Sequence, residues 1–425
     1  MVSISKLLQG GLLIIGQSAY HLATPEQASV DNCNIIRFLG GSAPYIQHPG
    51  YGISSDIPSI CGLEQGQLAF LNDYDYFAKD ESQFGLETTD ENSQGPFAGT
   101  RDLFRHGAYF RSRYNDLYNS SYTLPVFTTN SNRVHKSAEC FVKGFLGDEY
   151  GTDKIKFNIL AKDPSLGANT LTPRYACANY DIAANSKLLH NRNDQFLYDI
   201  LERITKDNND IKLTKHDIIN LFDWCAYEIN VTGQSPVCDL FTNDDLVAYA
   251  YYKDLGKFYT SGPGNNMSTV IGSVLLNASL VLLEDTEADN KIWLNFIHDT
   301  DIDHYMSALG IFTPEYPLPV DEILFDRKFV HANLVPQGAR LYTEKYNCDG
   351  DSYVRFVLND AVIPIPGCNN GPGFSCGFDD FRSFIKQRLE RIDYIEECGV
   401  PANVSQSLTF YWDFKTKNYT APFEV

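Results

Sequence analysis

Positive charge is scarce in this sequence, and the shortage excludes one large class of functions. The 425 residues include 34 lysines and arginines against 54 aspartates and glutamates, which gives a formal net charge of −20 at pH 7. Nucleic-acid binders normally carry a basic face that neutralises phosphates, so we expect no nucleic-acid partner. An anionic substrate would be repelled by the general field, and a local cluster of Arg, Lys or His would have to attract it.

Two further absences narrow the possibilities. No two cysteines are separated by just two residues, so the ten cysteines lack the spacing of a zinc site, and we expect no metal and no other cofactor. Beyond residue 23 no apolar run approaches the length of a membrane-spanning helix, so we expect no membrane partner. With 43% hydrophobic residues and no internal repeat, the composition predicts a compact globular protein.

The N-terminus has the anatomy of a secretory signal peptide. One lysine precedes an apolar run from Leu7 to Ile15, and small residues follow it. We therefore assign 1–23 to a signal peptide. The protein is expected to be secreted to the extracellular space, the cell wall or the periplasmic space.

Cysteines and glycosylation sequons agree with secretion. Disulfides persist in oxidising compartments, and the near pairs Cys225/Cys238 and Cys368/Cys376 enclose turn-rich loops that suit local bridges. The long-range pairings stay open. Asn-x-Ser/Thr sequons predict glycosylation at Asn119, Asn230, Asn266, Asn277, Asn403 and Asn418.

The pattern of apolar residues predicts an α/β fold. Residues 123–134 read as a strand followed by a polar turn, and SAECFVKGFLG then has helical spacing. Residues 290–310 repeat this pattern, with IWLNFI as a buried strand, HDTD at its carboxyl end and a helix from about Asp303. Ligands of open α/β sheets bind at such strand ends.

The remaining segments suggest a division into two domains. Residues 181–280 are mainly helical and predict a helical cap, whereas 24–180 and 281–425 would form the α/β domain. ARLYTEKY and YVRFVLND alternate apolar and polar residues, which predicts a hairpin. FDDFRSFIKQRLERI is amphipathic and predicts a late helix.

Several stretches match a known family. RFLGGSAPYIQHPGYGISSDIP, LPVFTTNSNRVHKSA, FIHDTDI and LVPQGARLYTEKY are among them, and the match runs from about Asn32 to the C-terminus. The chain resembles the fungal histidine acid phosphatases, close to the secreted acid phosphatases and phytases of yeasts. The resemblance implies a histidine-phosphatase-like mixed sheet with flanking helices and a smaller helical cap. It also implies small phosphomonoester substrates, phytate among the candidates, and leaves a homo-oligomer open.

The same resemblance implies a two-step reaction and assigns roles to three residues. In the family, the histidine of an R-H-G-x-R-x-P motif attacks phosphorus, and water then hydrolyses the phosphohistidine. Arg133 matches a phosphate-binding arginine, His298 a second phosphate-contacting histidine and Asp299 the proton donor. Their chemistry fits these roles, because a guanidinium fork suits phosphoryl oxygens and a carboxylic acid can protonate a leaving alkoxide.

Nearby polar residues have simpler interpretations. Asp301 and Asp303 can be helix-start carboxylates. His135 and Lys136 either add positive potential to the site or belong to a solvated helix start. His331 is expected to be a structural or pocket-rim residue.

The Arg-His-Gly triplet at His106 does not continue as the family motif. Tyr109 and Arg111 stand where the motif has its second arginine and its proline. Apolar residues between Leu103 and Tyr114 follow helical periodicity, with Gly107 on the buried face. We therefore expect His106 to be a histidine on a helix surface and not the nucleophile.

The nucleophile motif itself is missing from the expected place. In relatives it lies between the stretches that match IPSICGLEQ and GQLAFLNDYDYF, which abut here at Gln65 and Gly66. The nucleophile is therefore unknown, and we predict that phosphatase activity is absent or severely reduced. The alternatives are a non-catalytic secreted glycoprotein that binds phosphate or phosphoesters, and a shortened chain that does not fold.

Overall fold

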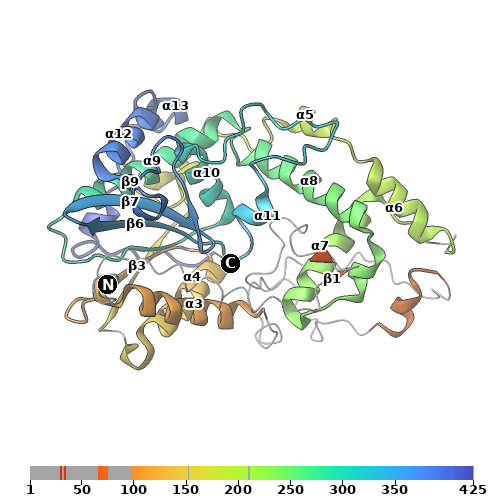
Figure 1. Cartoon of the computed structure of the whole chain (residues 1–425), viewed down its shortest axis with the longest axis horizontal. Coiled ribbons are helices and arrows are strands. Elements are labelled where there is room, and N and C mark those ends of the chain that lie inside the picture. Colours follow the sequence, from red (N-terminus) through yellow and green to blue (C-terminus); the bar gives the residue numbers. More distant parts are fainter. Residues whose placement is uncertain are drawn as a thin grey trace, which may run out of the picture.

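The computed structural model has two parts, which Figure 1 shows side by side. One part holds strands β3, β6, β7 and β9 with helices above and below them, and the other consists mainly of helices α6, α7 and α8. The predicted signal peptide and Gln65 lie outside the described residues. The structure describes residues 29–30, 33–34, 66–74, 97–151, 153–208 and 211–424.

A parallel sheet lies at the centre of the first part. Its strand order is β4 (Ile155–Leu160), β3 (Leu124–Thr129) and β5 (Leu294–Phe296). All six residues of β3 are buried, as expected for the middle strand of a parallel sheet. Because the strands are parallel, their carboxyl ends meet at one edge, where the following loops gather.

Both predicted strand–loop–helix units are confirmed. Helix α4 (Asn132–Leu146) follows β3, and α10 (Asp299–Leu309) follows β5. The start expected at about Asp303 was too late, since α10 begins directly after His298. Carboxylates in the first turn favour this early start, because they interact well with the positive end of a helix.

The predicted hairpin is also confirmed. Strands β6 (Leu341–Cys348) and β7 (Asp351–Leu358) pair antiparallel along their whole length. Asp349 and Gly350 connect them with positive φ values of 53° and 96°, which suits an Asp-Gly hairpin turn. Strands β8 (Ala361–Ile363) and β9 (Cys376–Gly377) pair with β7. The α/β fold class is therefore confirmed.

Helices α3 (Gly99–Tyr114) and α4 touch each other at two glycines. A Cβ on Gly107 would lie 1.9 Å from the carbonyl oxygen of Phe141, and a Cβ on Gly144 would lie 1.9 Å from that of Phe104. Such distances leave no room for any side chain in a close-packed interior. The prediction that Gly107 faces the core is confirmed.

Helix α9 (Asn266–Glu284) packs against the sheet, although the predicted cap extended to residue 280. Leu276 shares a hydrophobic cluster with Phe127 of β3. By length and composition α9 could also cross a membrane, so the expectation that no such stretch exists was wrong. Half of its apolar window is buried inside the protein, and the same leucines and valines that fill the core give the helix its hydropathy.

The cap has a hydrophobic core of its own. Helices α6 (Gln195–Thr205), α7 (Lys215–Thr232) and the first half of α8 (Asn243–Thr260) surround it. The ring of Phe222 stacks on Phe241 at 3.7 Å and on Tyr249 at 3.9 Å, measured between centroids. The second half of α8 packs instead against α10, so this helix reaches from the cap to the sheet edge.

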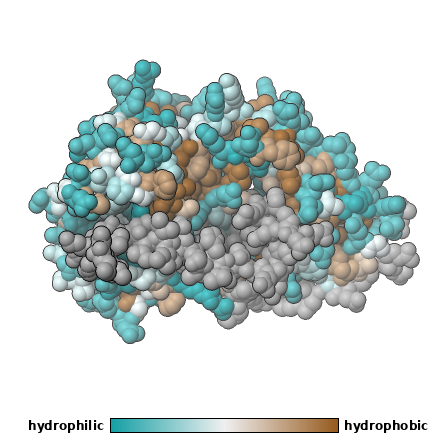
Figure 2. All heavy atoms as spheres, viewed as in Figure 1, coloured by the Kyte–Doolittle hydropathy of each residue, from teal (hydrophilic) through white to brown (hydrophobic). Residues whose placement is uncertain are grey.

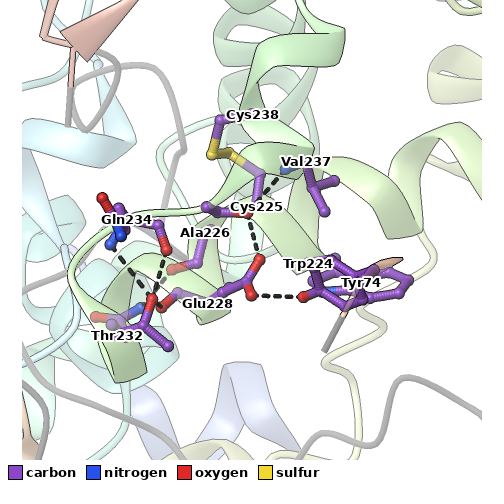
Figure 3. Close-up of a disulfide and its surroundings, with 11 residues drawn as sticks. Tyr74, Trp224, Cys225, Ala226, Glu228, Thr232, Gln234, Val237 and Cys238 are labelled. Atoms are coloured by element: carbon purple, nitrogen blue, oxygen red, sulfur yellow. Dashed lines mark hydrogen bonds between the residues drawn. A yellow bond between two sulfur atoms is a disulfide. The ribbon is translucent and has the colours of Figure 1, made fainter. Parts of the chain in front are cut away.

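A saturated polar cluster lies beside this core (Figure 3). The buried carboxylate of Glu228 accepts hydrogen bonds from the hydroxyls of Tyr74 and Ser235. The indole N–H of Trp224 donates to the same tyrosine oxygen over 2.9 Å. Cys225 and Cys238 form a disulfide next to it.

The disulfide predictions hold, and one long-range bridge adds to them. Cys225–Cys238 and Cys368–Cys376 are bonded as expected. The bridge that sequence analysis left open joins Cys177 to Cys398, 221 positions apart.

The prediction of glycosylation is wrong at one sequon. Asn230 is 1% exposed inside α7, and its amide donates to the carbonyl of Ala226, so a folded chain cannot carry a glycan there. The asparagines of the other five sequons are exposed. Figure 2 shows mainly hydrophilic residues on the outer parts of the visible surface, with a more apolar region near the middle.

The remaining described strands and α-helices are short or peripheral. They are β1 (Ser29–Val30), β2 (Cys33–Asn34), α5 (Ser186–His190), α11 (His331–Leu334), α12 (Phe378–Leu389), α13 (Tyr394–Cys398) and α14 (Phe410–Asp413).

Candidate functional site

Cationic residues gather around His298 at the carboxyl edge of the parallel sheet. Arg133 lies in the first turn of α4 after β3, Lys162 comes two residues after β4, and His298 lies between β5 and α10. Arg174, from a short 3-10 turn, is the third cation that acts on His298. In the structure the charge of Arg133 acts on His298, and so do the charges of Lys162 and Arg174, which sequence analysis missed.

His298 has an unsatisfied ring nitrogen. Its Nε2 is buried and has no hydrogen-bond partner in the part of the chain that the structure describes. Burial lowers the pKa of His298 to about 3, and the positive charges of Lys162, Arg133 and Arg174 act in the same direction. The ring is therefore neutral under mildly acidic conditions. A buried polar atom without a partner costs about 1–3 kcal/mol, and a phosphoryl oxygen would satisfy it.

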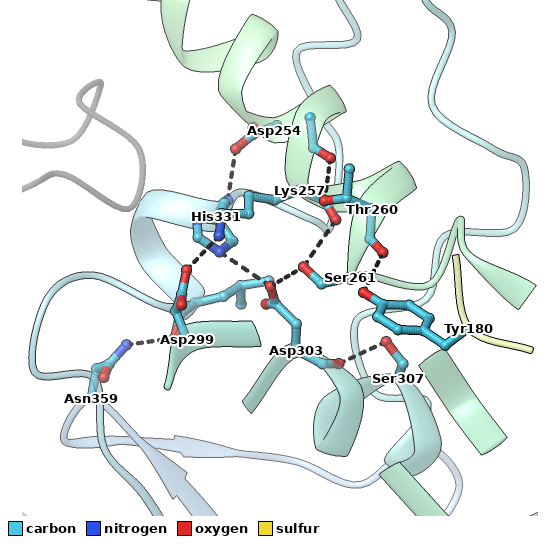
Figure 4. Close-up of polar contacts among 12 residues, drawn as sticks. Tyr180, Asp254, Lys257, Thr260, Ser261, Asp299, Asp303, Ser307, His331 and Asn359 are labelled. Atoms are coloured by element: carbon cyan, nitrogen blue, oxygen red, sulfur yellow. Dashed lines mark hydrogen bonds and ion pairs between the residues drawn. The ribbon is translucent and has the colours of Figure 1, made fainter. Parts of the chain in front are cut away.

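Asp299 is held by a lysine from the cap helix (Figure 4). Lys257 of α8 forms an ion pair with its carboxylate. Desolvation alone would raise the pKa of Asp299, but the charge and hydrogen bond of Lys257, together with His331 and the backbone N–H of Thr300, hold the pKa well below its ordinary value. A general acid must carry its proton at the working pH. Asp299 can therefore donate a proton only when Lys257 moves away or a bound anion offsets its charge.

A buried polar layer fixes this lysine's helix to the sheet edge (Figure 4). Asp303 accepts a hydrogen bond from Ser261 over 2.7 Å and lies 3.4 Å from His331 Nε2. The backbone N–H of His331 donates to Asp254 over 2.8 Å, and Arg327 pairs with the same carboxylate at 2.6 Å. His331 is thus a buried structural residue. Asp303 is not a solvated helix-start carboxylate, because it is fully buried and links α8 to α10.

Asp301 is also more than a helix-start charge. It is 2% exposed, and neither carboxyl oxygen has a hydrogen-bond partner among the described residues. Burial raises the pKa of Asp301 to about 7, although Arg174 at 3.5 Å opposes the change. At acid pH this residue is a neutral carboxylic acid.

His106 lies on the predicted helix but not on its surface. Its side chain is buried, since the residue is 7% exposed, and its ring centroid lies 4.8 Å from that of Phe141. Nε2 hydrogen-bonds with the hydroxyl of Tyr342, and burial lowers the pKa of His106 to about 3. The surface placement was wrong because His106 follows Leu103 by three residues and precedes Phe110 by four, which puts all three on one face.

His135 and Lys136 each pair with a carboxylate of their own helix. Glu139 pairs with His135 at 3.6 Å and with Lys136 at 3.2 Å. Lys136 is an exposed residue. The interpretation as a solvated helix start therefore fits Lys136, whereas the His135 side chain is only 13% exposed and its ring lies 4.7 Å from that of Phe157.

Comparison with known proteins identifies a set of similar chains. A sequence profile of the histidine phosphatase superfamily (branch 2) matches residues 60–359. A phytase of Candida albicans is 49% identical over 462 residues, with 100% of both chains covered. A constitutive acid phosphatase of Saccharomyces cerevisiae is 39% identical over 430 residues, with 91% of each chain covered. The crystal structure of the phytase from D. castellii has a TM-score of 0.86 at 45% identity, and the match covers 97% of this chain and 98% of that one.

The lengths of these alignments bear on the missing motif. The alignment with the Candida albicans phytase is 462 residues long, 37 more than the 425 residues of this chain, so at least 37 positions have no counterpart here. This number of residues would suffice for a strand, a loop and a short helix, but the alignment length does not give their positions. That the R-H-G-x-R-x-P segment is among the unmatched positions stays a prediction.

Proposed function

Because the chain belongs to the histidine phosphatase superfamily (branch 2), we propose that it binds phosphomonoesters at the carboxyl edge of the parallel sheet and hydrolyses them slowly or not at all. Phytate is one candidate ligand, since two of the similar proteins are phytases. The proposal concerns this chain, whereas the similar proteins are named as phytases and acid phosphatases.

The observation that carries the proposal is the unsatisfied Nε2 of His298 among several cations. In a chain with a net charge of −20, a local group of Arg133, Lys162 and Arg174 is what an anion needs to approach. The neutral imidazole can donate a hydrogen bond to a phosphoryl oxygen, and the guanidinium groups can contact others.

Two observations argue against rapid hydrolysis. His106 is buried among aromatic rings and its Nε2 is engaged by Tyr342, so it is poorly placed to attack phosphorus. Asp299 is ionised while it pairs with Lys257, and in that state it does not carry the proton that a leaving alcohol requires. Loss of a covalent nucleophile costs about a millionfold in turnover in a well-studied protease.

Binding is tested with inorganic phosphate and with phytate by titration calorimetry at pH 5. We expect saturable binding that weakens at least about tenfold in Arg133→Ala, because a charge-assisted hydrogen bond contributes about 1.5–3 kcal/mol. Arg391→Ala is the matched control, since this arginine is exposed. Absence of phosphate binding by the wild-type protein would contradict the proposal.

Hydrolysis is tested on the same preparation with a chromogenic phosphomonoester at acid pH. The expected result is turnover several orders of magnitude below that of an active acid phosphatase, without a trapped phosphoenzyme. The names of the similar proteins favour the other outcome, an active enzyme. Rapid turnover, or a phosphoryl label found on His106 after acid quenching, would establish that the chain is an active enzyme.

Secretion as a glycoprotein is the accompanying proposal. Three disulfides support it, because such bonds persist in oxidising compartments, and the asparagines of five sequons are exposed. Protein recovered from the medium of expressing yeast should lose mass after endoglycosidase treatment, and Asn230→Gln should leave that loss unchanged.

A further inference from the structure

The segment 419–424 crosses the carboxyl edge of the parallel sheet. It first runs along the outer edge of β4, where Ile159 N–H donates to Tyr419 O over 2.7 Å and Ala421 N–H donates to Ile159 O over 3.1 Å. It then crosses the end of β3, where Asn130 binds the backbone at both Pro422 and Glu424, each over 3.0 Å. The segment therefore brings an acidic side chain to the edge that carries the candidate site.

The carboxylate of Glu424 pairs with Lys162. The lysine side chain is 10% exposed, whereas that of Glu424 is 45% exposed. The backbone N–H of Lys162 donates to Asn130 Oδ1 over 3.0 Å, which fixes the lysine at the end of β4. A largely buried cation is thus paired with a carboxylate that remains half in solvent.

The charge of Lys162 also faces the site. It is one of the three cations whose field acts on His298, and it acts on Asp301 as well. Ion pairs with one half-exposed partner contribute at most about 1 kcal/mol, so an anion that other residues of the site also hold can displace the carboxylate.

We propose that Lys162 is a further anion-binding residue of the phosphate site and that the Glu424 carboxylate is its intramolecular competitor. The inference rests on the proposed phosphate binding. A phosphate that reaches His298 and Arg133 takes Lys162 as an additional partner, and segment 419–424 then loses its ion pair.

Two substitutions test the inference by calorimetric titration with inorganic phosphate at pH 5. Glu424→Gln should tighten binding about fivefold, because it removes a competitor of at most about 1 kcal/mol. Lys162→Met should weaken binding about tenfold, and Lys162→Arg should restore most of it. Lys415→Met is the matched control, since its ion pair with Asp289 lies on an exposed surface. Thermal melts establish that each variant is folded.

Hydrogen exchange provides a second measurement that does not depend on affinity. Saturating phosphate should speed exchange at the amides of Ala421 and Glu424 in the wild-type protein. In Lys162→Met, exchange at these two amides should already be faster than in the wild type when no phosphate is present.

The outcomes separate this inference from the proposed function. If Arg133→Ala abolishes binding while Lys162→Met and Glu424→Gln leave the affinity unchanged, the inference is wrong and the proposed function stands. If neither the wild type nor Glu424→Gln binds phosphate, the proposed function fails and the inference fails with it. Unchanged exchange at Glu424 under saturating phosphate would overturn the displacement of the segment.

Discussion

Two buried carboxylates, Glu228 in the cap and Asp301 at the sheet edge, have opposite surroundings. Both of Glu228's oxygens accept hydroxyl hydrogen bonds, from Tyr74 and Ser235. Asp301 has no hydrogen bond to its oxygens among the described residues, and its nearest cation, Arg174, lies 3.5 Å away. Burial raises the pKa of both carboxyls.

The difference distinguishes a structural polar group from one kept for a ligand. A satisfied network rigidifies a fold, whereas an unsatisfied buried group costs free energy until something binds it. On this ground we propose that the sheet edge, with His298, Asp301 and the cations around them, is the functional region, and that the cap cluster stabilises the fold.

The largest expected effect is the pH dependence of stability that comes from Asp301. Its folded pKa of about 7 exceeds the ordinary value of 3.8, so its contribution is complete below about pH 4 and is lost as pH rises through 7. The loss amounts to about 4 kcal/mol of unfolding free energy. Asp301→Asn should remove this decline, as urea unfolding between pH 4 and pH 8 would measure. If unfolding free energy declined with pH equally in the wild type and in Asp301→Asn, the decline would not come from Asp301.

Removal of the satisfied carboxylate should destabilise the cap. Glu228→Ala leaves two hydroxyl donors without their acceptor and opens a small cavity, so we expect a loss of about 3 kcal/mol in unfolding free energy. Glu202→Ala on the exposed face of α6 is the control and should change little. If Glu228→Ala and Glu202→Ala had equal urea midpoints, the hydrogen-bonded carboxylate of Glu228 would not stabilise the cap.

Loss of the unsatisfied imidazole should hardly affect stability. His298→Ala removes a buried polar atom that lacks a partner among the described residues, so we expect a change of at most about 1 kcal/mol in unfolding free energy. Phosphate affinity should fall about tenfold or more in the same variant. His216→Ala, at an exposed position of α7, should change neither quantity. If His298→Ala were strongly destabilised but still bound phosphate with full affinity, His298 would be a structural group and not one kept for a ligand.

The smallest effect on stability is expected from Lys257→Met. Its ion pair with Asp299 is partly exposed, so unfolding free energy should change by less than about 1 kcal/mol. The pKa of Asp299 should rise, because the ammonium that holds it down is gone. Carboxyl chemical shifts followed by NMR through a pH titration measure this rise, and an unchanged pKa would contradict the role given to Lys257.

Much of the fold could be predicted because local patterns determine it. The uniformly buried β3, the helical spacing of α4 and the Asp349-Gly350 turn each require only their own segment. The His298-Asp299 pair and Arg133 were also accessible, since both follow strands whose carboxyl ends must meet in a parallel sheet.

The missed residues approach the site from elements distant in sequence. Lys257 comes from the cap helix and pairs with Asp299, whereas Arg174 comes from a short 3-10 turn and acts on His298, and no local pattern indicates either contact. Lys162 was accessible in principle, because it follows β4 as Arg133 follows β3. His106 and Asn230 were misplaced because polarity or a motif was given more weight than the helix face on which each residue lies.

The bridge between Cys177 and Cys398 closes a covalent ring that contains the cap, β5 and the hairpin. A protease that nicks the chain once anywhere inside that ring would release no fragment. The two pieces would migrate together on a non-reducing gel and separate only after thiol treatment. If a single cut lowered the mass of the band on a non-reducing gel, that cut would lie outside residues 177–398.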